Sequence, residues 1–576
     1  PRSSSSSSST HRTRNLKKST PAHSPVVLSR RWGFKMASVY EQYVTRCLSM
    51  STSTSQLLVA SLGAMLLLFL LMRWSGGIGT SSRQEAGMGR KGWKLPPGPP
   101  GWPVVGNLLQ VGLSGKPFMH YVRDLRPAYG PIFTMKMGWR TLIIVSSPEL
   151  AHEALVQKGP LFASRPAETP TRNVFSCHKF TVNSAIYGPE WRSLRRNMVS
   201  GMLSTTRLRE FRAVRRDAMD RFISRLRAEA EAGAGAVWVL RNARFAVFCI
   251  LLSMCFGLQL TEDEITHVDQ VMKRVLMVLN PRMDDFLPLL APFFFRERRE
   301  ATRVRQLQID TVVHLIDRRR AVLHRRGDRS SEDSMNAAPF SYLDTLLDLK
   351  VEGRDTCPTD PELVTLCSEF INGGTDTTAT AIEWAIARLI ENPAIQSRLY
   401  EEIAAHQQAS GASVIEETEL EKMPYLQAFA KELLRKHPPT YFSLTHAVVE
   451  ATTLGGYDVP PGVNVEFYLP PIAQDPRLWR KPEAFEPERF LTGGEEADML
   501  CLAGGVKMMP FGAGRRVCPG LSMGMTHITL LIARMVQEFE WSAHPDQPGV
   551  LLDEKLEFTV VMNRTLRALV RPRNAL

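Results

Sequence analysis

The sequence predicts a mainly α-helical protein with small β-sheets and a membrane anchor near its N terminus. Three observations support this fold class. Apolar residues recur at helical spacing through most of the chain. Runs with the alternation typical of strands are short. An apolar run without charges, residues 57–72 of the 576-residue chain, approaches the length that spans a bilayer.

The expected elements follow from these patterns in chain order. Helical spacing predicts helices over residues 117–129, 148–158, 207–232, 302–325, 361–391 and 422–436. Strand-like runs occupy residues 132–137, 141–145, 457–459 and 463–468. Two polar stretches, 326–339 and 406–419, are interpreted as surface loops. No repeat or long linker divides residues 104–576, which we interpret as one large domain.

The first hundred residues separate into three segments by composition. Residues 1–50 form a basic, Ser-rich tail. Its first 35 residues either are a transit peptide or are translated upstream sequence, with the true start at Met36 or Met50. We favour the second interpretation. Residues 51–74 are interpreted as a signal-anchor, because basic residues follow the apolar run. Residues 75–103 form a Gly/Ser-rich linker and a stiff Pro-rich hinge.

The charge and the cysteines exclude two classes of function. The net charge of +13 is concentrated in the tail, where nine Lys/Arg residues stand against the single acid Glu41. The remaining chain has no basic stripe interleaved with aromatic residues, so nucleic-acid binding is not expected. The eight cysteines show no CxxC spacing, and they predict neither a zinc site nor a disulfide framework.

The most informative stretch runs from Phe511 to Gly520 and contains the lone cysteine Cys518. Its glycines permit a sharp turn and a close approach to a flat macrocycle. The N–H groups at the start of the following helix would lower the pKa of the thiol and tune a bond to iron. Arg516 can neutralise a propionate by a charge-assisted contact, and Phe511 would shield the sulfur from water.

Two further motifs have purely structural explanations when each is taken alone. Glu432 and Arg435 lie three residues apart on one helical face, as many surface pairs do, and Arg489 follows in a Pro-Glu-Arg-Phe segment. Residues 373–378, Gly-Gly-Thr-Asp-Thr-Thr, interrupt a predicted helix. The glycines cost about 1 kcal/mol each relative to alanine, and the threonine hydroxyls can bond back to carbonyls and open a turn. A helix crossing point is the alternative.

In this order and roughly this spacing over residues 95–576, the motifs resemble those of the cytochrome P-450 family of haem-thiolate monooxygenases. The resemblance implies a cytochrome P-450 fold, a helical haem domain over residues 104–576, and haem b as cofactor with Cys518 as the axial iron ligand. It also implies a set of haem-binding residues: Trp191, Arg195, Gly374, His446, Phe511 and Arg516.

The resemblance further assigns two groups of residues. Thr377 and Asp376 would hold water and deliver protons while oxygen is activated. Glu432, Arg435 and Arg489 would form a structural network that orders the loop of Cys518 and does no chemistry. The alternative for Trp191 and Arg195 is a core tryptophan beside a surface arginine, and the alternative for His446 is a histidine at the edge of the core.

The implied reaction inserts one oxygen atom of dioxygen into a lipophilic substrate, because a thiolate ligand favours O–O cleavage. The sequence contains no dinucleotide fingerprint, so electrons are expected from a separate, membrane-bound NADPH-cytochrome reductase. Members of the fold that rearrange hydroperoxides typically lack the groove threonine, which is present here as Thr377. The alternative to an enzyme is a non-catalytic haem-binding protein. The Asp376–Thr377 pair argues against this alternative.

The substrate and the location rest on a finer resemblance. Residues 161–166, residues 183–198 and the hinge are similar to plant microsomal members. Within these, the whole chain most resembles a subfamily of in-chain fatty-acid hydroxylases and epoxidases linked to cutin. The pocket would then include Phe370, Leu444 and Val560. A phenylpropanoid or terpenoid substrate is the alternative. The expected location is the endoplasmic-reticulum membrane, with a single N-terminal anchor and a cytosolic catalytic domain.

Overall fold

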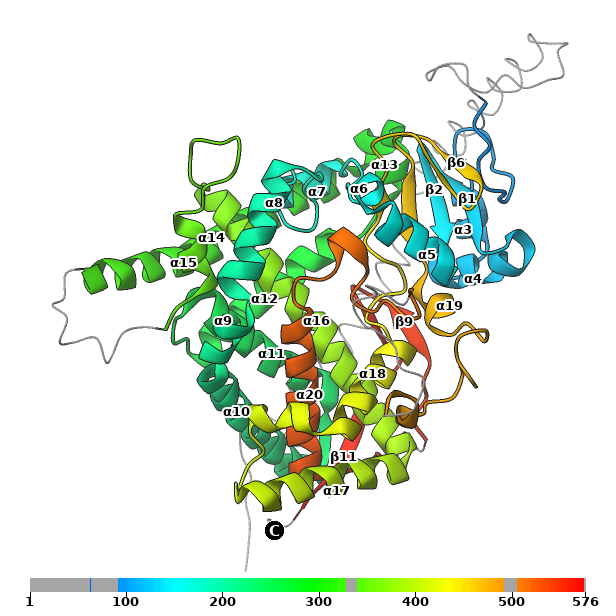
Figure 1. Cartoon of the computed structure of the whole chain (residues 1–576). Helices are drawn as coiled ribbons and strands as arrows, with labels where there is room; N and C mark the ends of the chain where they lie inside the picture. Colours follow the sequence, from blue (N-terminus) through cyan, green and yellow to red (C-terminus); the bar gives the residue numbers. More distant parts are fainter. Residues whose placement is uncertain (1–62, 64–91, 328–338, 492–504, 548, 574–576) are drawn as a thin grey trace, which may run out of the picture. The chain divides into compact units, whose positions relative to one another are not determined.

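The structure, a computed structural model, describes residue 63 and residues 92–327, 339–491, 505–547 and 549–573. Residues 92–576 form one unit of the chain. The expected tail, anchor and most of the linker, together with most of the expected loop at 326–339, lie outside the described residues. The unit is mainly helical with small sheets, as the sequence predicts (Figure 1).

The helices account for most of the described residues. In chain order they are α3 (Leu108–Leu113), α4 (Phe118–Tyr129), α5 (Pro148–His152), α6 (Gly159–Phe162), α7 (Pro170–Phe175), α8 (Pro189–Arg196), α9 (Thr205–Glu210), α10 (Arg212–Ala232), α11 (Val239–Phe256), α12 (Glu262–Val278), α13 (Met283–Phe286), α14 (Phe295–Gly327), α15 (Tyr342–Leu347), α16 (Asp360–Glu391), α17 (Pro393–Ser410), α18 (Pro424–Lys436), α19 (Leu469–Ala473) and α20 (Leu521–Glu538). Shorter turns are π-helical, η1 (Glu153–Gln157) and η2 (Asn197–Met202), or 3₁₀, η3 (Pro288–Phe294), η5 (Glu417–Lys422), η6 (Pro487–Phe490) and η7 (Gly514–Arg516).

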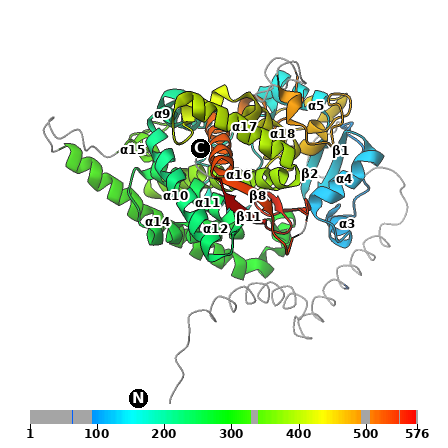
Figure 2. The same cartoon turned by 90° about the horizontal axis from the view of Figure 1, so that it is seen from below.

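The strands among the described residues form four small sheets. They are β1 (Ile132–Met137), β2 (Arg140–Val145), β3 (Ala236–Trp238), β4 (His446–Ala447), β5 (Thr452–Leu454), β6 (Tyr457–Val459), β7 (Asn464–Phe467), β8 (Phe539–Ala543), β9 (Glu554–Leu556), β10 (Val560–Met562) and β11 (Arg567–Pro572). The largest sheet has the order β1-β2-β7-β4, with β2 and β7 parallel and Leu142 opposite Asn464. Figures 1 and 2 both show β1 and β2 beside α4, away from α10.

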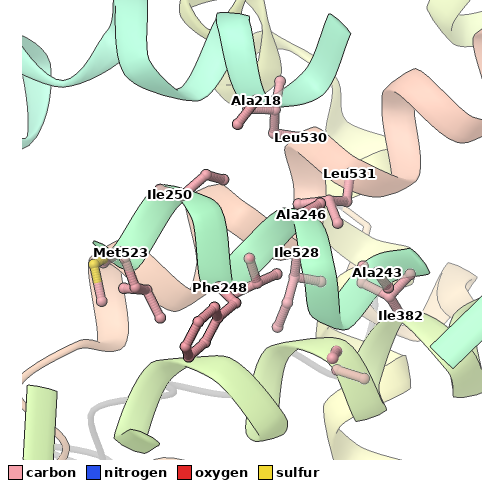
Figure 3. Close-up of a cluster of buried hydrophobic side chains, with 14 of the residues drawn as sticks. Ala218, Ala243, Ala246, Phe248, Ile250, Ile382, Met523, Ile528, Leu530 and Leu531 are labelled. Atoms are coloured by element: carbon pink, nitrogen blue, oxygen red, sulfur yellow. The ribbon is translucent and has the colours of Figure 1, made fainter. Parts of the chain in front are cut away.

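The core lies where α11, α16 and α20 pack together, with α10 against α11 and α20. Figure 3 shows apolar side chains from the four helices meeting there, among them Ala246, Ile382 and Leu531. Small residues such as Ala246 let the helices approach closely, and burial of the larger ones contributes about 1.5–3 kcal/mol each. Helix α16 thus runs through the interior, and its side chains face several neighbours at once.

Three expectations about local structure need correction. The Gly-Gly pair does not interrupt α16, which is continuous over Asp360–Glu391 because packing on both sides outweighs the low helix propensity of glycine. The expected loop at 406–419 is partly helical: α17 continues to Ser410, where Gly411 ends it in the left-handed conformation at φ 64°. Helix α14 begins at Phe295, before the predicted residue 302, because its first turns are charged and lack an apolar stripe.

Helix α11 is the one helix among the described residues that is long and apolar enough to cross a membrane. Most of its side chains are buried against α10 and α16. Its composition is therefore that of a core helix. The apolar run at 57–72 lies outside the described residues.

Candidate active site

The loop of Cys518 is a tight turn between η7 and α20. Gly514 has φ 67°, and a methyl group built on it would lie 1.9 Å from the carbonyl oxygen of Leu155, so only glycine fits. The backbone N–H of Cys518 donates to the carbonyl of Phe511 at 2.8 Å. Helix α20 starts three residues after the cysteine, at Leu521. The thiol is thereby held at a helix start.

Opposing influences act on the thiol of Cys518. Burial raises its pKa, whereas the backbone N–H of Gly520 and the charge of Arg195 act in the opposite direction. The ring of Phe511 lies close to Gly524, one turn into α20, since a methyl group there would be 3.3 Å from Cε1 of Phe511. Helix-start N–H groups and a nearby cation stabilise a thiolate. This arrangement is suited to a metal-bound sulfur.

Three arginine side chains gather near this loop and donate to backbone carbonyls only, among the described residues. Arg516 donates to Ala163, Val182 and Ala185, Arg195 donates to Val517 at 2.7 Å, and Arg165 donates to Asn183, Leu444 and Thr445. Burial lowers the pKa of Arg165 to about 10. Burial, Arg165 and Arg195 lower that of Arg516 to about 9. We call Arg165, Arg195 and Arg516 the arginine cluster.

Two other predicted haem-binding residues adjoin the arginine cluster. The indole N–H of Trp191 donates to the carbonyl of Val182 at 3.1 Å, and the guanidinium of Arg516 lies 4.5 Å from the centre of its ring. His446 contacts the carbonyl of Phe162 through Nδ1 at 2.7 Å. Burial, Arg165 and Arg516 lower the pKa of His446 to about 3. With Nδ1 as donor, Nε2 of the neutral ring has no proton to give, so His446 would pair with a carboxylate only as a cation.

One carboxylate faces this group of cations. Glu369 on α16 senses the charges of Arg195 and Arg516, but accepts its hydrogen bonds from backbone N–H groups. The arginine cluster therefore carries more positive charge than Glu369 balances, and buried guanidinium groups favour bidentate carboxylate partners. A macrocycle with two propionates would supply them. The donor set fits haem: Cys518 would ligate the iron, and the arginine cluster would hold the propionates.

Helix α16 has free space beside Gly373. A methyl group built there would meet nothing within 4 Å, although α16 runs through the core. Gly374 differs, because its methyl group would lie 2.9 Å from Cδ1 of Leu251. Gly374, which the sequence motif predicted to bind haem, thus lies at the contact with α11. The hydroxyl of Thr377, one turn beyond Gly373, donates to the carbonyl of Gly373 at 2.9 Å.

Asp376 forms an ion pair that sequence reasoning missed. Nε of Arg244 on α11 lies 2.6 Å from Oδ1 of Asp376, and the same guanidinium contacts Asp269 on α12. Burial lowers the pKa of Arg244, but the two aspartates outweigh this and raise it. Oδ2 of Asp376 is buried and accepts no hydrogen bond from the described residues. Arg244 therefore fixes Oδ1 of Asp376, whereas Oδ2 has no donor among the described residues.

Glu432, Arg435 and Arg489 meet behind the loop of Cys518. Glu432 accepts two bonds from Arg435, at 2.7 and 2.8 Å, and Nε of Arg489 lies 3.2 Å from Oε2 of Glu432. The side chains of Glu432 and Arg435 have no solvent exposure. The N–H of Glu486 also donates to Glu432, at 2.8 Å. The three residues tie α18 to η6, as a structural network requires.

The three predicted pocket residues lie in different surroundings. Phe370 is buried and stacks on Tyr342, with ring centres 4.8 Å apart. Val560 is buried, and its carbonyl accepts from the indole of Trp384 at 2.8 Å. Leu444 is 57% exposed. The structure therefore does not gather them around one described cavity.

Comparison with known proteins finds resemblances to one family, to curated relatives and to solved structures. The family model described as Cytochrome P450 matches residues 96–569. "Cytochrome P450 89A9" of Arabidopsis thaliana is 34% identical over 83% of this chain and 94% of its own length. "Flavonoid 3'-monooxygenase" of the same plant is 30% identical over 83% and 91%. A zebrafish cytochrome P450 structure with progesterone aligns at a TM-score of 0.65 and 22% identity, over 80% of this chain and all of the other.

Proposed function

We propose a substrate, a redox partner and a location for this chain from the premise that it belongs to the cytochrome P450 family. It is a haem-thiolate monooxygenase of the plant type. When bound, the haem supplies the activation of dioxygen, and the protein supplies binding, orientation, protons and exclusion of water. The observation that carries the activity is the half-buried Cys518 just before α20, with the backbone N–H of Gly520 directed at its sulfur.

The residues around the haem are proposed to work as follows. Cys518 ligates the iron, and the arginine cluster neutralises the propionates. Gly373 leaves space for oxygen on the distal side. Thr377 already donates its hydroxyl proton to Gly373, so its lone pairs are free to hold a water or to accept a proton in transit. Asp376 orients this region through its ion pair with Arg244.

The proposed substrate is a fatty acid, hydroxylated or epoxidised within its chain. The resemblance of the chain to plant microsomal in-chain fatty-acid hydroxylases supports it. Hydroxylation of a phenylpropanoid or terpenoid is the second candidate, and the likeness to a flavonoid 3'-monooxygenase favours it. Both candidates are lipophilic, which is the substrate class that the family generally uses.

The haem spin state distinguishes the two candidates. Full-length protein is titrated with dodecanoic acid, with oleic acid and with the flavonoid naringenin, and the Soret band is recorded. A low-to-high-spin shift with the fatty acids and not with naringenin is expected. A shift with naringenin alone would overturn the fatty-acid proposal and support the second candidate. Product analysis with reductase and NADPH then gives the position of the oxygen.

The proposed location is the endoplasmic-reticulum membrane, with an anchor in residues 51–74, a linker and hinge in residues 75–103 and a haem domain in residues 104–576. Electrons are proposed to come from an NADPH-cytochrome reductase. Within the described part, the exposed apolar side chains of Trp139, Leu289 and Phe293 support an additional contact with the bilayer. Their segments adjoin, because the N–H of Trp139 donates to the carbonyl of Phe286 at 3.2 Å.

Fluorescent fusions that start at residue 1, at Met36 and at Met50 test the location. Reticulum labelling by all three is expected. Plastid import of the longest form, with loss of its first 35 residues, would contradict the proposal.

A further inference from the structure

Trp384 is a buried side chain on α16 to which the proposed mechanism gives no role. It follows Thr377 by seven residues, and Thr380 lies between them, so the three side chains share one face of the helix. Thr377 bonds to the carbonyl of Gly373, which borders open space. Trp384 therefore lies two turns beyond the proposed oxygen-binding region, on the same face.

Two side chains of this face hold the hairpin formed by β9 and β10, residues 554–562, which we call the β9–β10 hairpin. The hydroxyl of Thr380 lies 2.8 Å from that of Thr559. One turn further along α16, the indole N–H of Trp384 donates to the carbonyl of Val560 at 2.8 Å. Contacts from successive turns of one helix to successive residues of the hairpin fix both its position and its direction along α16.

The tip of the β9–β10 hairpin changes in exposure from one residue to the next. Thr559 is buried against α16, whereas the side chain before it, Phe558, is 49% exposed. An apolar ring that stays exposed beside a contact with a core helix is suited to line a cavity for a lipophilic ligand. The open space at Gly373 lies on the same face, two turns before Thr380. We therefore expect Phe558 to face the substrate.

The ring of His437, which follows α18, stacks on the indole of Trp384. The ring centres are 4.1 Å apart, and the planes differ by 8°. Nε2 of His437 accepts from Nε of Arg388, one turn beyond Trp384 on α16, at 2.9 Å. Burial and the charge of Arg388 hold the pKa of His437 well below its ordinary value, so the ring is neutral. Trp384 thus fixes the end of α18 as well as the hairpin.

The chain that follows His437 meets the hairpin at Val560. The carbonyl of Pro439 accepts the N–H of Val560 at 2.9 Å, and Trp384 donates to the carbonyl of the same residue. Both backbone groups of Val560 are thus used beside one indole. From Pro439 the chain continues to Leu444, whose carbonyl accepts from Arg165 of the arginine cluster at 3.0 Å.

We propose that Trp384 is a specificity-determining positioning residue: it fixes the hairpin tip and residues 439–445 relative to the oxygen-binding region of α16, and thereby decides which part of the substrate lies nearest to the iron. The inference rests on the proposed function, because it takes these two segments as walls of the substrate pocket. Trp384 acts through Val560 and His437 rather than by touching the substrate. A tryptophan suits this role, since its large rigid ring has only two χ angles.

The core offers a matched control in Trp541 on β8. Its ring is also buried, and its indole N–H also donates to a backbone carbonyl, that of Met535 on α20, at 2.9 Å. Trp541→Phe therefore removes the same donor from the same kind of environment, away from α16. Thr529 on α20 is the corresponding control for Thr559, because its buried hydroxyl donates to the carbonyl of Met525 at 2.8 Å.

The test compares two ligands of haem iron that differ in size, imidazole and 4-phenylimidazole, whose Kd values are measured from the Soret shift of the full-length holoenzyme. In Trp384→Phe the buried carbonyl of Val560 loses its donor, and the loosened walls must be ordered when the phenyl ring binds. The Kd of 4-phenylimidazole should therefore rise about fivefold or more, whereas that of imidazole stays within about twofold. Trp541→Phe should lower the melting temperature but keep both Kd values within about twofold of the wild type.

Thr559→Val removes one contact of the hairpin with little change of volume, so it serves even if Trp384→Phe takes up no haem. It should raise the Kd of 4-phenylimidazole about threefold, as the loss of one hydrogen bond predicts, and Thr529→Val should leave it unchanged. A second readout is the position of the hydroxyl group in the products from dodecanoic acid, with reductase and NADPH. The products of Trp384→Phe should carry it on more carbon atoms than those of the wild type.

Three results would overturn the proposal. One is an unchanged ratio of the two Kd values in Thr559→Val and in any haem-loaded Trp384→Phe. Another is an equal rise of the Kd of 4-phenylimidazole in Trp541→Phe, which would make the effect one of general stability. The third is an unchanged set of products in Trp384→Phe. If the wild type does not oxidise dodecanoic acid, the fatty-acid proposal fails instead, and the Kd ratios still decide the role of Trp384 because they need no substrate.

Discussion

Replacement of Glu432 by alanine should unfold the region behind the haem-binding loop. The substitution removes the acceptor for two bonds from Arg435, one from Arg489 and one from the N–H of Glu486. Arg435 keeps its bonds to the carbonyls of Ala473, Pro482 and Ala484, but its charge loses its only carboxylate within the described residues. A fully buried guanidinium is left without a counter-charge.

The expected cost is about 3–5 kcal/mol, the range for breaking a buried ion pair by removing one partner. The whole folding free energy of a protein is typically about 5–15 kcal/mol. The ratio of folded to unfolded protein should therefore fall between about a hundredfold and several thousandfold. Because η6 leads toward the loop of Cys518, haem uptake should fail along with stability.

The assay is the haem content of purified protein, from the spectrum of the reduced carbonyl complex, together with the urea midpoint. Glu486→Ala serves as control: its side chain is 34% exposed and lies 3.5 Å from Arg489, so haem content and midpoint should change little. A Glu432→Ala protein with full haem content and an unchanged midpoint would refute the reasoning, because the buried charge would then have found compensation.

Three further predictions follow from the site. Cys518→Ala should abolish the thiolate-type spectrum of the reduced carbonyl complex, and a variant that keeps this spectrum would rule out Cys518 as ligand. Thr377→Ala should retain haem and substrate affinity while product per NADPH drops roughly tenfold or more; unchanged coupling measured with the reductase would contradict the proton-handling role. Because the folded-state pKa of Glu383 is raised to about 7 from 4.5, its contribution to stability is present below pH 4.5 and is lost as pH rises through 7. The melting temperature of the wild type should hence fall more between pH 5 and pH 8 than that of Glu383→Gln, and equal slopes would count against the shift.

Local sequence was sufficient to predict features that depend on close neighbours along the chain. The turn before Cys518 follows from its glycines, and the meeting of Glu432 with Arg435 follows from a three-residue helical spacing. The choice between Gly373 and Gly374 was also available, because Gly373 precedes Thr377 by four residues and must share its face. The prediction that Gly374 binds haem did not take this helical spacing into account.

Contacts between distant segments could not be predicted in this way. Arg244 lies in an apolar helix, 132 residues before the aspartate that it pairs with, and nothing in its neighbourhood indicates a partner. Glu369 bonds to N–H groups 186 and 187 residues away. Every residue except proline has a backbone N–H group, so the sequence does not indicate which of them a carboxylate will bind. A glutamate with backbone donors therefore has the same sequence pattern as any other acid on a helix. Such contacts are set by how the elements pack.

The open space beside Gly373 has a consequence for how this enzyme can be redesigned. Alanine at that position would meet no atom within 4 Å and would add about 1 kcal/mol of helix propensity to α16. If oxygen and substrate meet beside this position, as proposed, the glycine keeps volume there at the cost of helix stability. We expect Gly373→Ala to change the regioselectivity through the volume of one methyl group and to raise the melting temperature. At Gly374 the same exchange would press on Leu251 and shift the packing of two core helices instead.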